Sequence, residues 1–498
     1  MARTPFTNKN QEHTMTASTA ADTAALIEAA HSAFLKGQAA SPAERAEWLT
    51  AIATTLDANA EELIGLAAEE THLATARLTG ELTRTAFQLR LLAEEITAGF
   101  HLDATIDHSD ASWGMGPRPD IRRMNVPLGV VGVFGASNFP FAFSVIGGDS
   151  SSALAAGAAV VHKIHSAHLK LGLRTSELVS GALAAAGAPQ GLFGSVVGRA
   201  AAEMLVDHPL VKAVGFTGST AGGRALFDRA CARPVPIPFF GELGSINPVV
   251  VTQKAWARRG DQILREFAMS FTMGMGQFCT KPGLLFVPAG DWDQISSALS
   301  GALLGSAGTE MLSDGLHEAF EESLRAVAAE DGVSVIVQGR NAPVPLPSVL
   351  GTTSAVVRNN PSILHREMFG PASLVVQYET EDELPALVEL LEGQLTATLQ
   401  AEDDDDLGDL VGLLREKAGR LLWNGWPTGV TVSYAQQHGG PYPATTSASS
   451  SVGTSAIARF MRPVAFQSFP AQRLPMALRD DNPWRVVQRV NGSVASQG

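Results

Sequence analysis

Apolar residues recur at helical spacing through the first hundred residues of the chain. Over 61–70, leucine, isoleucine and alanine fall three or four positions apart among glutamates, which is typical of an amphipathic helix. The segment Ser41-Pro-Ala-Glu44 has the residues of a capping box, with proline at the first helical position. We therefore predict several amphipathic helices over 20–100. The stretch 111–125 is rich in Gly, Pro and Arg without helical period, which is typical of a hairpin leaving the main body.

From Val126 onward, short apolar runs alternate with helical segments. The predicted strands are Val130–Phe134, Ala159–His162, Phe193–Val197, Ala213–Thr217 and Val235–Phe240. Two prolines within the last run restrict it to a sheet edge, and a small-residue helix is expected over Phe141–Ala156. The alternation indicates an α/β fold, with a parallel sheet covered on both faces and ligands at the carboxyl ends of its strands. We expect a nucleotide-binding domain over 126–240.

A second α/β series is expected over 247–426, with amphipathic helices at 381–391 and 405–414. The acidic run 402–406 is most simply a helix start, where carboxylates favour the dipole. A metal site is not expected there, because successive side chains cannot converge on one ion. A loop of Gly, Ser, Thr and Pro covers 439–455, and loops of this length inside compact domains are often functional.

Composition and charge narrow the function. A chain of 498 residues, 45% of them hydrophobic and 17% charged, can bury a large core. Its formal net charge of −14 argues against nucleic acid as a partner. No stretch approaches the ~18 apolar residues of a membrane span, and the polar segment 1–19 is expected to be a flexible leader, with Met15 as an alternative start. Two cysteines exclude a disulfide framework and fit a reducing cytoplasm.

Two residues carry candidate covalent and acid–base chemistry. Cys279 lies between two glycines and a Lys-Pro-Gly turn, a loop that can hold a nucleophilic thiol in a cleft with its N–H free. Free cysteines are also common as small buried apolar residues, the role expected of Cys231 at a helix end. Glu242 ends an apolar run, where burial should raise its pKa and suit a general base. The alternative for Glu242 is an ordinary pair with a lysine or arginine.

Turns after the predicted strands carry candidate ligand-binding residues. Asn138 can donate to an oxyanion or cap a helix, and Lys163 can reach a ribose or phosphate or lie in solvent. In Gly215–Gly223, a helix opening on Ser219 offers free N–H groups to a pyrophosphate, although the turn lacks the usual dinucleotide fingerprint. Glu367 precedes a rigid Phe-Gly-Pro turn of a kind that is also common on protein surfaces.

Asn-Phe-Pro, a lysine-containing turn, Phe-Thr-Gly-Ser, Glu-Leu-Gly, Gly-Gln-Phe-Cys and Glu-Met-Phe-Gly-Pro follow one another in that order. From about residue 20 onward, the chain thereby resembles the NAD(P)-dependent aldehyde dehydrogenase superfamily. It is more similar to one subgroup, the NADP-preferring α-ketoglutaric semialdehyde (2,5-dioxovalerate) dehydrogenases. The segments that carry this similarity are Phe134–Phe143, Lys163–His168, Ser245–Pro248, Gly276–Thr280, Asn424–Gly429, His438–Thr446 and Leu478–Pro483.

The resemblance implies that Cys279 attacks the aldehyde to form a thiohemiacetal, that hydride passes to a nicotinamide, and that the remaining thioester is hydrolysed. Asn138 and the Cys279 N–H match an oxyanion hole, and Glu242 matches the base that activates water. The implied cofactor-binding residues are Lys163, Ser166, Arg199, Thr217, Gly218, Ser219, Gly223, Leu243, Glu367 and Phe369. No metal is implied.

Cofactor preference rests on two of these residues. NAD-preferring relatives carry a glutamate at the position of Ser166, which repels a 2′-phosphate. Arg199 matches an arginine that pairs with that phosphate in the NADP-preferring subgroup. We therefore expect NADP, with NAD as an alternative.

The resemblance also implies an architecture. A Rossmann-type cofactor domain is expected over 20–105 and 125–241, and an α/β catalytic domain over 242–440. A small β oligomerisation flap would combine 106–124 with 456–498. An edge strand of such a flap is commonly covered by a partner subunit, so a homodimer or homotetramer is expected.

The substrate expected from the subgroup is α-ketoglutaric semialdehyde, a small aldehyde oxidised to 2-oxoglutarate. Phe278 beside the thiol would narrow the aldehyde tunnel, and Lys281, Arg122 or Arg123 are candidate cations for a distal carboxylate. Three alternatives stay open: a broad-specificity or fatty aldehyde dehydrogenase, a CoA-acylating dehydrogenase, and a non-catalytic binding protein. The glutamate at 242 argues against the second, and the complete catalytic set argues against the third.

Overall fold

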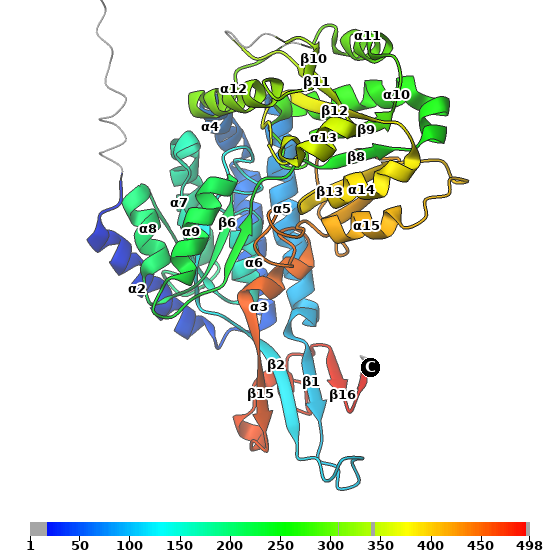
Figure 1. The fold of residues 1–498 in the computed structure, drawn as a ribbon. Helices are drawn as coiled ribbons and strands as arrows, with labels where there is room; N and C mark the ends of the chain where they lie inside the picture. Colours follow the sequence, from blue (N-terminus) through cyan, green and yellow to red (C-terminus); the bar gives the residue numbers. More distant parts are fainter. Residues whose placement is uncertain (1–16, 307, 340–343, 495–498) are drawn as a thin grey trace, which may run out of the picture.

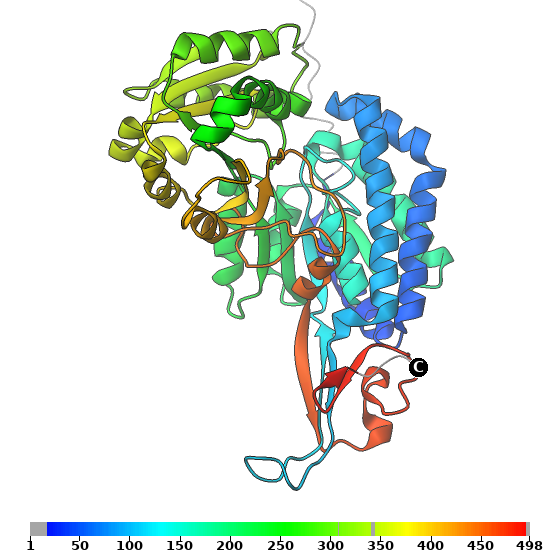
Figure 2. The ribbon, with the colours of Figure 1, turned by 90° about the vertical axis from the view of Figure 1, so that its right-hand side faces the viewer.

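The computed structural model describes residues 17–306, 308–339 and 344–494. Two α/β lobes lie against each other, and a smaller sheet projects away from them (Figure 1 and Figure 2). The expected leader lies outside the described residues except for 17–19, and so does Met15. Within the described ranges, no helix is both long and apolar enough to cross a bilayer.

Four helices form the N-terminal part of the described chain, as the helical periodicity predicts. Their bounds are α2 Ala20–Gly37, α3 Pro42–Ala58, α4 Ala60–Thr71 and α5 Thr75–Ala98. The capping box predicted for α3 is confirmed, because the Ser41 hydroxyl accepts from the Glu44 N–H and the Glu44 carboxylate accepts from the Ser41 N–H. The longest of the four, α5, packs against α3 and α4.

The first lobe contains a five-stranded parallel sheet in the order β5–β4–β3–β6–β7. Its strands are β3 Val130–Phe134, β4 Ala159–Lys163, β5 Phe193–Val196, β6 Val211–Thr217 and β7 Phe239–Glu242. The helices between them are α6 Gly148–Ala156, α7 Leu169–Ala185, α8 Arg199–Asp207 and α9 Thr220–Cys231. The alternating pattern therefore predicted this parallel sheet correctly.

Three details of this lobe differ from the prediction. The helix expected from Phe141 begins at Gly148, because the Gly148 N–H donates to the Ala142 carbonyl and closes a turn wider than an α-helical one. The strand expected from Val235 begins at Phe239, after the two prolines that lack N–H donors. Cys231 is exposed rather than packed, because α9 buries little more than Gly223 and Ala230.

The second lobe contains a seven-stranded sheet in the order β10–β11–β12–β9–β8–β13–β14, parallel except at its edge strand β10. Its strands are β8 Pro248–Val251, β9 Leu284–Pro288, β10 Ser334–Val337, β11 Ser348–Thr353, β12 Ala372–Tyr378, β13 Gln394–Gln400 and β14 Ala418–Trp423. Its helices are α10 Gln253–Thr272, α11 Trp292–Leu303, α12 Asp314–Ala328, α13 Ser354–Asn359, α14 Leu384–Glu389 and α15 Leu410–Lys417.

The acidic run 402–406 does not begin a helix, contrary to the prediction, because α15 starts at Leu410. Glu402 instead pairs with Arg258 at 2.8 Å and with Arg259 at 2.9 Å. Asp405 accepts a hydrogen bond of 2.7 Å from the Thr252 hydroxyl. The two α10 arginines thus offset the negative charge of this acidic run, which a helix dipole was expected to stabilise.

A third sheet, in the order β15–β2–β1–β16–β17, joins segments that are far apart in the sequence. Its strands are β1 Ala104–Asp107, β2 Ile121–Pro127, β15 Met461–Gln467, β16 Gln488–Val490 and β17 Ser493–Val494. The stretch predicted as a hairpin connects β1 to antiparallel β2 and extends away from the two lobes (Figure 1).

The loop 439–455 connects the lobes. It comes after β14 of the second lobe and passes beside β7 of the first, as the orange segment in Figure 2 shows. There the Leu243 N–H donates to the Ala444 carbonyl at 2.8 Å, and the Thr446 N–H donates to the Gly241 carbonyl at 3.0 Å. These bonds hold the middle of the loop next to the carboxyl end of β7.

Candidate active site

Cys279 lies on a tight loop between α10 and β9, as predicted. Gly274 and Gly276 of this loop have φ angles of +56° and +66°, which glycine adopts without strain. A Cβ on Gly276 would lie 2.1 Å from the Gly370 carbonyl oxygen, so this close approach requires glycine. On the other side, the Asn247 amide donates to the carbonyls of Cys279 at 2.8 Å and Lys281 at 2.9 Å. The thiol is therefore held by a fixed backbone.

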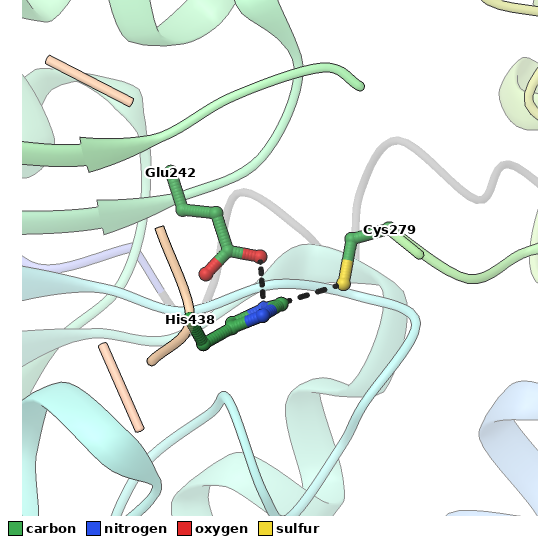
Figure 3. Close-up of side chains that lie close together, drawn as sticks. All are labelled: Glu242, Cys279 and His438. Carbon is green, nitrogen blue, oxygen red and sulfur yellow. Dashed lines mark hydrogen bonds and ion pairs between the residues drawn. The ribbon is translucent and has the colours of Figure 1, made fainter. Parts of the chain in front are cut away.

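Two side chains lie next to this thiol (Figure 3). Glu242 comes from the end of β7 in the first lobe, and His438 directly precedes the connecting loop 439–455. The His438 Nε2 lies 3.0 Å from a Glu242 carboxylate oxygen and 3.7 Å from the Cys279 sulfur. The other Glu242 oxygen accepts from the Ser451 hydroxyl at 2.8 Å. Glu242 and His438 are both buried, and one ligand atom from each of the three residues lies within 4.8 Å of the others. A proton can pass among sulfur, nitrogen and oxygen over these distances.

The environment sets the charge state of this cluster. Burial alone would raise the pKa of Glu242, but His438, Ser451 and Cys279 together outweigh burial and lower that pKa. The raised pKa expected for Glu242 is therefore wrong, because the residue is hydrogen-bonded and not merely surrounded by apolar groups. The pKa of Cys279 is raised well above its ordinary value, first by burial and then by the negative Glu242. The resting site thus pairs a thiol with a carboxylate.

Asn138 lies against the cysteine loop and does not cap a helix. Its amide donates to the Gln277 carbonyl at 3.0 Å, and the side chain is buried. Helix α6 begins well after it, with Gly147 at the N-cap position. The Asn138 side chain is thus hydrogen-bonded directly to the loop that carries Cys279.

A cavity of about 1070 Å³ opens at the carboxyl ends of the first sheet. The predicted cofactor-binding residues that line it are Lys163, Ser166, Arg199, Thr217, Gly218 and Ser219. Ser219 caps α9 by accepting from the Gly222 N–H, so the helix N-terminus faces this space. Positive side chains and a helix N-terminus are suited to the phosphates of a dinucleotide, and the donor set fits NAD(P).

The remaining predicted cofactor residues lie beside this cavity and do not line it. Gly223 packs on Leu243, because a Cβ on this glycine would lie 2.1 Å from the leucine Cδ2. The Glu367 carboxylate adjoins Gly244, where a Cβ would lie 2.7 Å from Oε2. Burial raises the pKa of Glu367 to about 7, an effect that Lys281 partly offsets. Phe369 follows on the same turn.

A second, smaller cavity of about 210 Å³ lies beside the thiol. Its lining combines Cys279 and His438 with three aromatic rings, two arginines and a glutamate: Phe139, Phe143, Phe278, Arg77, Arg84 and Glu81. The Phe139 ring meets Phe143 and Phe278 edge-on at centroid distances of 5.3 and 5.2 Å. Phe278 therefore borders the space beside the thiol, as the sequence suggested.

The cations proposed from the sequence for a distal carboxylate are elsewhere. Lys281 is buried and donates to backbone carbonyls of the 368–372 turn, where burial lowers its pKa to about 8. Arg122 lies in the third sheet and pairs with Asp120 at 3.0 Å and Asp480 at 2.8 Å. Arg123 pairs with Asp103 in the same sheet. This expectation is wrong, because each cation is committed to a structural partner.

Sequence reasoning missed three residues that face the thiol. Arg77 and Arg84 are seven positions apart on α5, a spacing that places them on one helix face two turns apart. The spacing alone could have shown that the two arginines share a helix face. Nothing in the sequence indicated that this face of α5 reaches the cysteine loop. His438 is the first residue of His438–Thr446, one of the segments on which the family resemblance rests. No chemical role was predicted for it.

Comparison with known proteins gives a family and a fold. A sequence model described as the aldehyde dehydrogenase family matches residues 2–462. The α-ketoglutaric semialdehyde dehydrogenase of Acinetobacter baylyi is 42% identical over 474 residues, covering 93% of this chain and 90% of that protein. α-Ketoglutaric semialdehyde dehydrogenase 2 of Azospirillum brasilense is 45% identical over 485 residues, covering 95% and 91%.

A variant of aldehyde dehydrogenase C from Pseudomonas syringae, solved with NAD+ and octanal, has the same fold. Its TM-score is 0.76 at 19% identity, over 91% of this chain and 90% of that chain. The predicted fold class, a mixed α/β architecture with a Rossmann-type sheet, is confirmed by this likeness and by the parallel sheets.

Proposed function

The chain belongs to the aldehyde dehydrogenase family and is an oxidoreductase acting on aldehydes, and on this basis we propose that it oxidises α-ketoglutaric semialdehyde to 2-oxoglutarate with NADP. The observation that carries the proposal is the cluster in which the His438 Nε2 lies 3.7 Å from the Cys279 sulfur and 3.0 Å from Glu242. The names of two relatives above 40% identity support the choice of substrate.

In the first step Cys279 adds to the aldehyde carbon. The raised pKa of the thiol means that its proton must leave as the carbon–sulfur bond forms, and the His438–Glu242 pair is within reach to accept it. The aldehyde oxygen then becomes an oxyanion, for which the Asn138 amide and the Cys279 N–H are the donors. Such preorganised donors are worth about 3 kcal/mol each to the transition state.

The first-lobe cavity would hold the dinucleotide, with Lys163 and Ser166 on the adenosine side and the N-terminus of α9 at the phosphates. When bound, the nicotinamide supplies the acceptor for the hydride, and this oxidation converts the thiohemiacetal into a thioester. Glu367 and Phe369, on the turn beside Gly244, are proposed to contact the nicotinamide end. Thr217, Gly218, Gly223 and Leu243 are proposed to shape the surface on which the cofactor lies.

Hydrolysis of the thioester needs a base for water. Glu242 is ionised above its lowered pKa, and one of its oxygens is oriented by the Ser451 hydroxyl at 2.8 Å. A carboxylate held in this way can take a proton from water next to Cys279. A CoA-acylating enzyme would not need this base.

The preference for NADP is proposed from Ser166 and Arg199. Both line the dinucleotide cavity, and Ser166 carries no charge that would repel a 2′-phosphate. The Arg199 side chain is 93% exposed and pairs with Glu203 on the next helical turn, so its guanidinium can turn toward a phosphate.

We further propose the assembly and location from features of the same chain. The third sheet leaves β15 and β17 as edge strands, which a partner subunit could cover in a homodimer or homotetramer. Both cysteines are free thiols, which fits a cytoplasmic enzyme. The domain limits proposed are 20–105 with 125–241 for the cofactor, 242–440 for catalysis, and 106–124 with 456–498 for the flap.

A steady-state screen tests the proposal. α-Ketoglutaric semialdehyde, succinic semialdehyde, hexanal and octanal are each assayed with NAD and NADP, with and without CoA, using Cys279→Ala as the control. The highest kcat/KM is expected for α-ketoglutaric semialdehyde with NADP, independent of CoA. A higher kcat/KM for octanal, or a requirement for CoA, would overturn it.

A further inference from the structure

Arg84 is held at the small cavity beside the thiol with most of its hydrogen-bonding capacity unused. Its Nε donates to the Val430 carbonyl at 3.2 Å, which fixes the direction of the guanidinium. Its Nη1 and Nη2 are buried and have no hydrogen-bond partner in the part of the chain that the structure describes. The guanidinium carbon lies 5.4 Å from the centroid of the Phe143 ring, which forms another wall of the same cavity.

Burying a guanidinium whose two Nη groups have no acceptor is unfavourable. Burial is the largest influence on Arg84 and lowers its pKa, opposed by the negative charge of Glu81 and, more weakly, by the thiolate form of Cys279 and by Glu242. Glu81 lies three residues earlier on the same helix and also lines the cavity. Its Oε1 accepts from the N–H groups of Phe141 and Ala142, and its Oε2 has no hydrogen-bond partner among the described residues. Glu81 therefore offsets charge without occupying the Arg84 donors.

Arg77, two turns earlier on α5, has a different function in the cavity. Its Nη2 donates to the Asn138 carbonyl at 2.6 Å, and its guanidinium carbon lies 5.0 Å from the Phe139 ring centroid and 4.7 Å from that of Phe278. It positions the residue proposed as the oxyanion donor. Its Nη1 is also buried and lacks a partner among the described residues, and Arg77 lines the same cavity.

We propose that the Nη groups of Arg84 bind the carboxylate at the distal end of the substrate, with the free Nη1 of Arg77 as a second donor, so that only an aldehyde with a terminal acid is held correctly over Cys279. This inference rests on the function proposed above and names the recognition element that it requires. A guanidinium presents two parallel N–H groups that match a carboxylate. The two ends of a five-carbon chain are about 5 Å apart when extended, and the small cavity brings Arg84 and the thiol into contact with one such molecule.

The test compares two aldehydes of the same chain length, 5-oxopentanoate and pentanal, which differ in the terminal carboxylate. In Arg84→Met, the ratio of kcat/KM for 5-oxopentanoate to kcat/KM for pentanal is expected to fall about 100-fold, since two charge-assisted hydrogen bonds are lost. Arg90→Met is the matched control, because Arg90 lies on the same helix and pairs with Asp57 outside the cavity. Its ratio should equal that of the wild type.

Other results distinguish the failures. If Arg84 only stabilised charge at Cys279, kcat/KM would fall equally for both aldehydes. The unchanged ratio would then contradict the proposal. If Arg84→Met did not fold, Arg84→Lys would be used. A ratio of the two kcat/KM values within threefold of that of the wild type would then contradict the proposal, and a larger fall in the ratio would support it. Failure of α-ketoglutaric semialdehyde as a substrate would refute the proposed function alone, since 5-oxopentanoate and pentanal report on Arg84 independently.

Discussion

Glu242, at the end of β7, is joined to His438, which directly precedes the connecting loop, by a contact of 3.0 Å between Oε1 and Nε2. The same Nε2 lies 3.7 Å from the Cys279 sulfur, on a loop of the other lobe. The acid–base chemistry proposed for this cluster therefore depends on three segments that meet only in the folded protein.

Replacement of His438 by glutamine should lower kcat/KM for the aldehyde about 100-fold, because the imidazole can pass its Nε2 proton to Glu242 and take the thiol proton in its place, which an amide cannot do. The measurement is steady-state kinetics together with the rate of Cys279 alkylation by iodoacetamide, which should fall in parallel. His365→Gln is the control, since His365 is exposed and bonds the Leu390 carbonyl in the second lobe. A His438→Gln enzyme within threefold of wild type would show that the imidazole takes no part.

The pH dependence of Cys279 alkylation should reflect its raised pKa. The rate should keep increasing through about pH 9 without a plateau near neutrality, because burial and the negative Glu242 both oppose the thiolate. In Glu242→Gln one of these causes is removed, so the profile should shift to lower pH. A profile that does not move, or one that shifts upward, would contradict this electrostatic picture.

The parts predicted from the sequence are those in which local pattern decides structure. Strands such as Val130–Phe134 and the Ser41 capping box depend on neighbouring residues, and both are present. Errors arose where partners distant in sequence dominate. Glu242 was expected to have a raised pKa, but His438, which is 196 residues away, together with Ser451 and Cys279 outweighs burial and lowers that pKa.

The small cavity beside the thiol shows the same limit. Lys281 is adjacent to the thiol in sequence and is a natural candidate cation, but it turns away to bind the 368–372 carbonyls. Arg84 is remote in sequence and reaches the cavity only because the chain folds α5 against the cysteine loop. Periodicity predicts helices over 20–100, while the neighbours of the helix face that carries Arg77 and Arg84 are decided by the tertiary structure.

Gly276→Ala should destabilise the protein by about 1–3 kcal/mol, because the new Cβ would lie 2.1 Å from the Gly370 carbonyl oxygen in a left-handed backbone conformation. The measurement is the urea unfolding midpoint, together with kcat, which should fall because the Cys279 loop must shift. Gly290→Ala is the control, since a Cβ on Gly290 would have no neighbouring atom within 4 Å. Equal midpoints for both variants would contradict the packing argument.

Arg199→Ala should raise the KM for NADP about tenfold and leave the KM for NAD nearly unchanged, because the lost charge is proposed to pair with the 2′-phosphate alone. Ser166→Glu should act in the same direction by repulsion. Arg224→Ala, on the exposed face of α9 where Arg224 pairs with Asp228 at 2.8 Å, is the control. An equal rise in the KM for NADP and the KM for NAD in Arg199→Ala would contradict the proposed NADP preference.

Cys279 is proposed to carry the oxidised substrate and Glu242 to release it. The most direct measurement of this division of roles is intact-protein and peptide mass spectrometry of Glu242→Gln after one addition of α-ketoglutaric semialdehyde and NADP, quenched in acid. An acyl adduct is expected on the peptide containing Cys279, formed together with about one equivalent of NADPH. No such adduct should form in the double variant Cys279→Ala/Glu242→Gln. Release of 2-oxoglutarate by Glu242→Gln at the wild-type rate, with no adduct on Cys279, would contradict both roles.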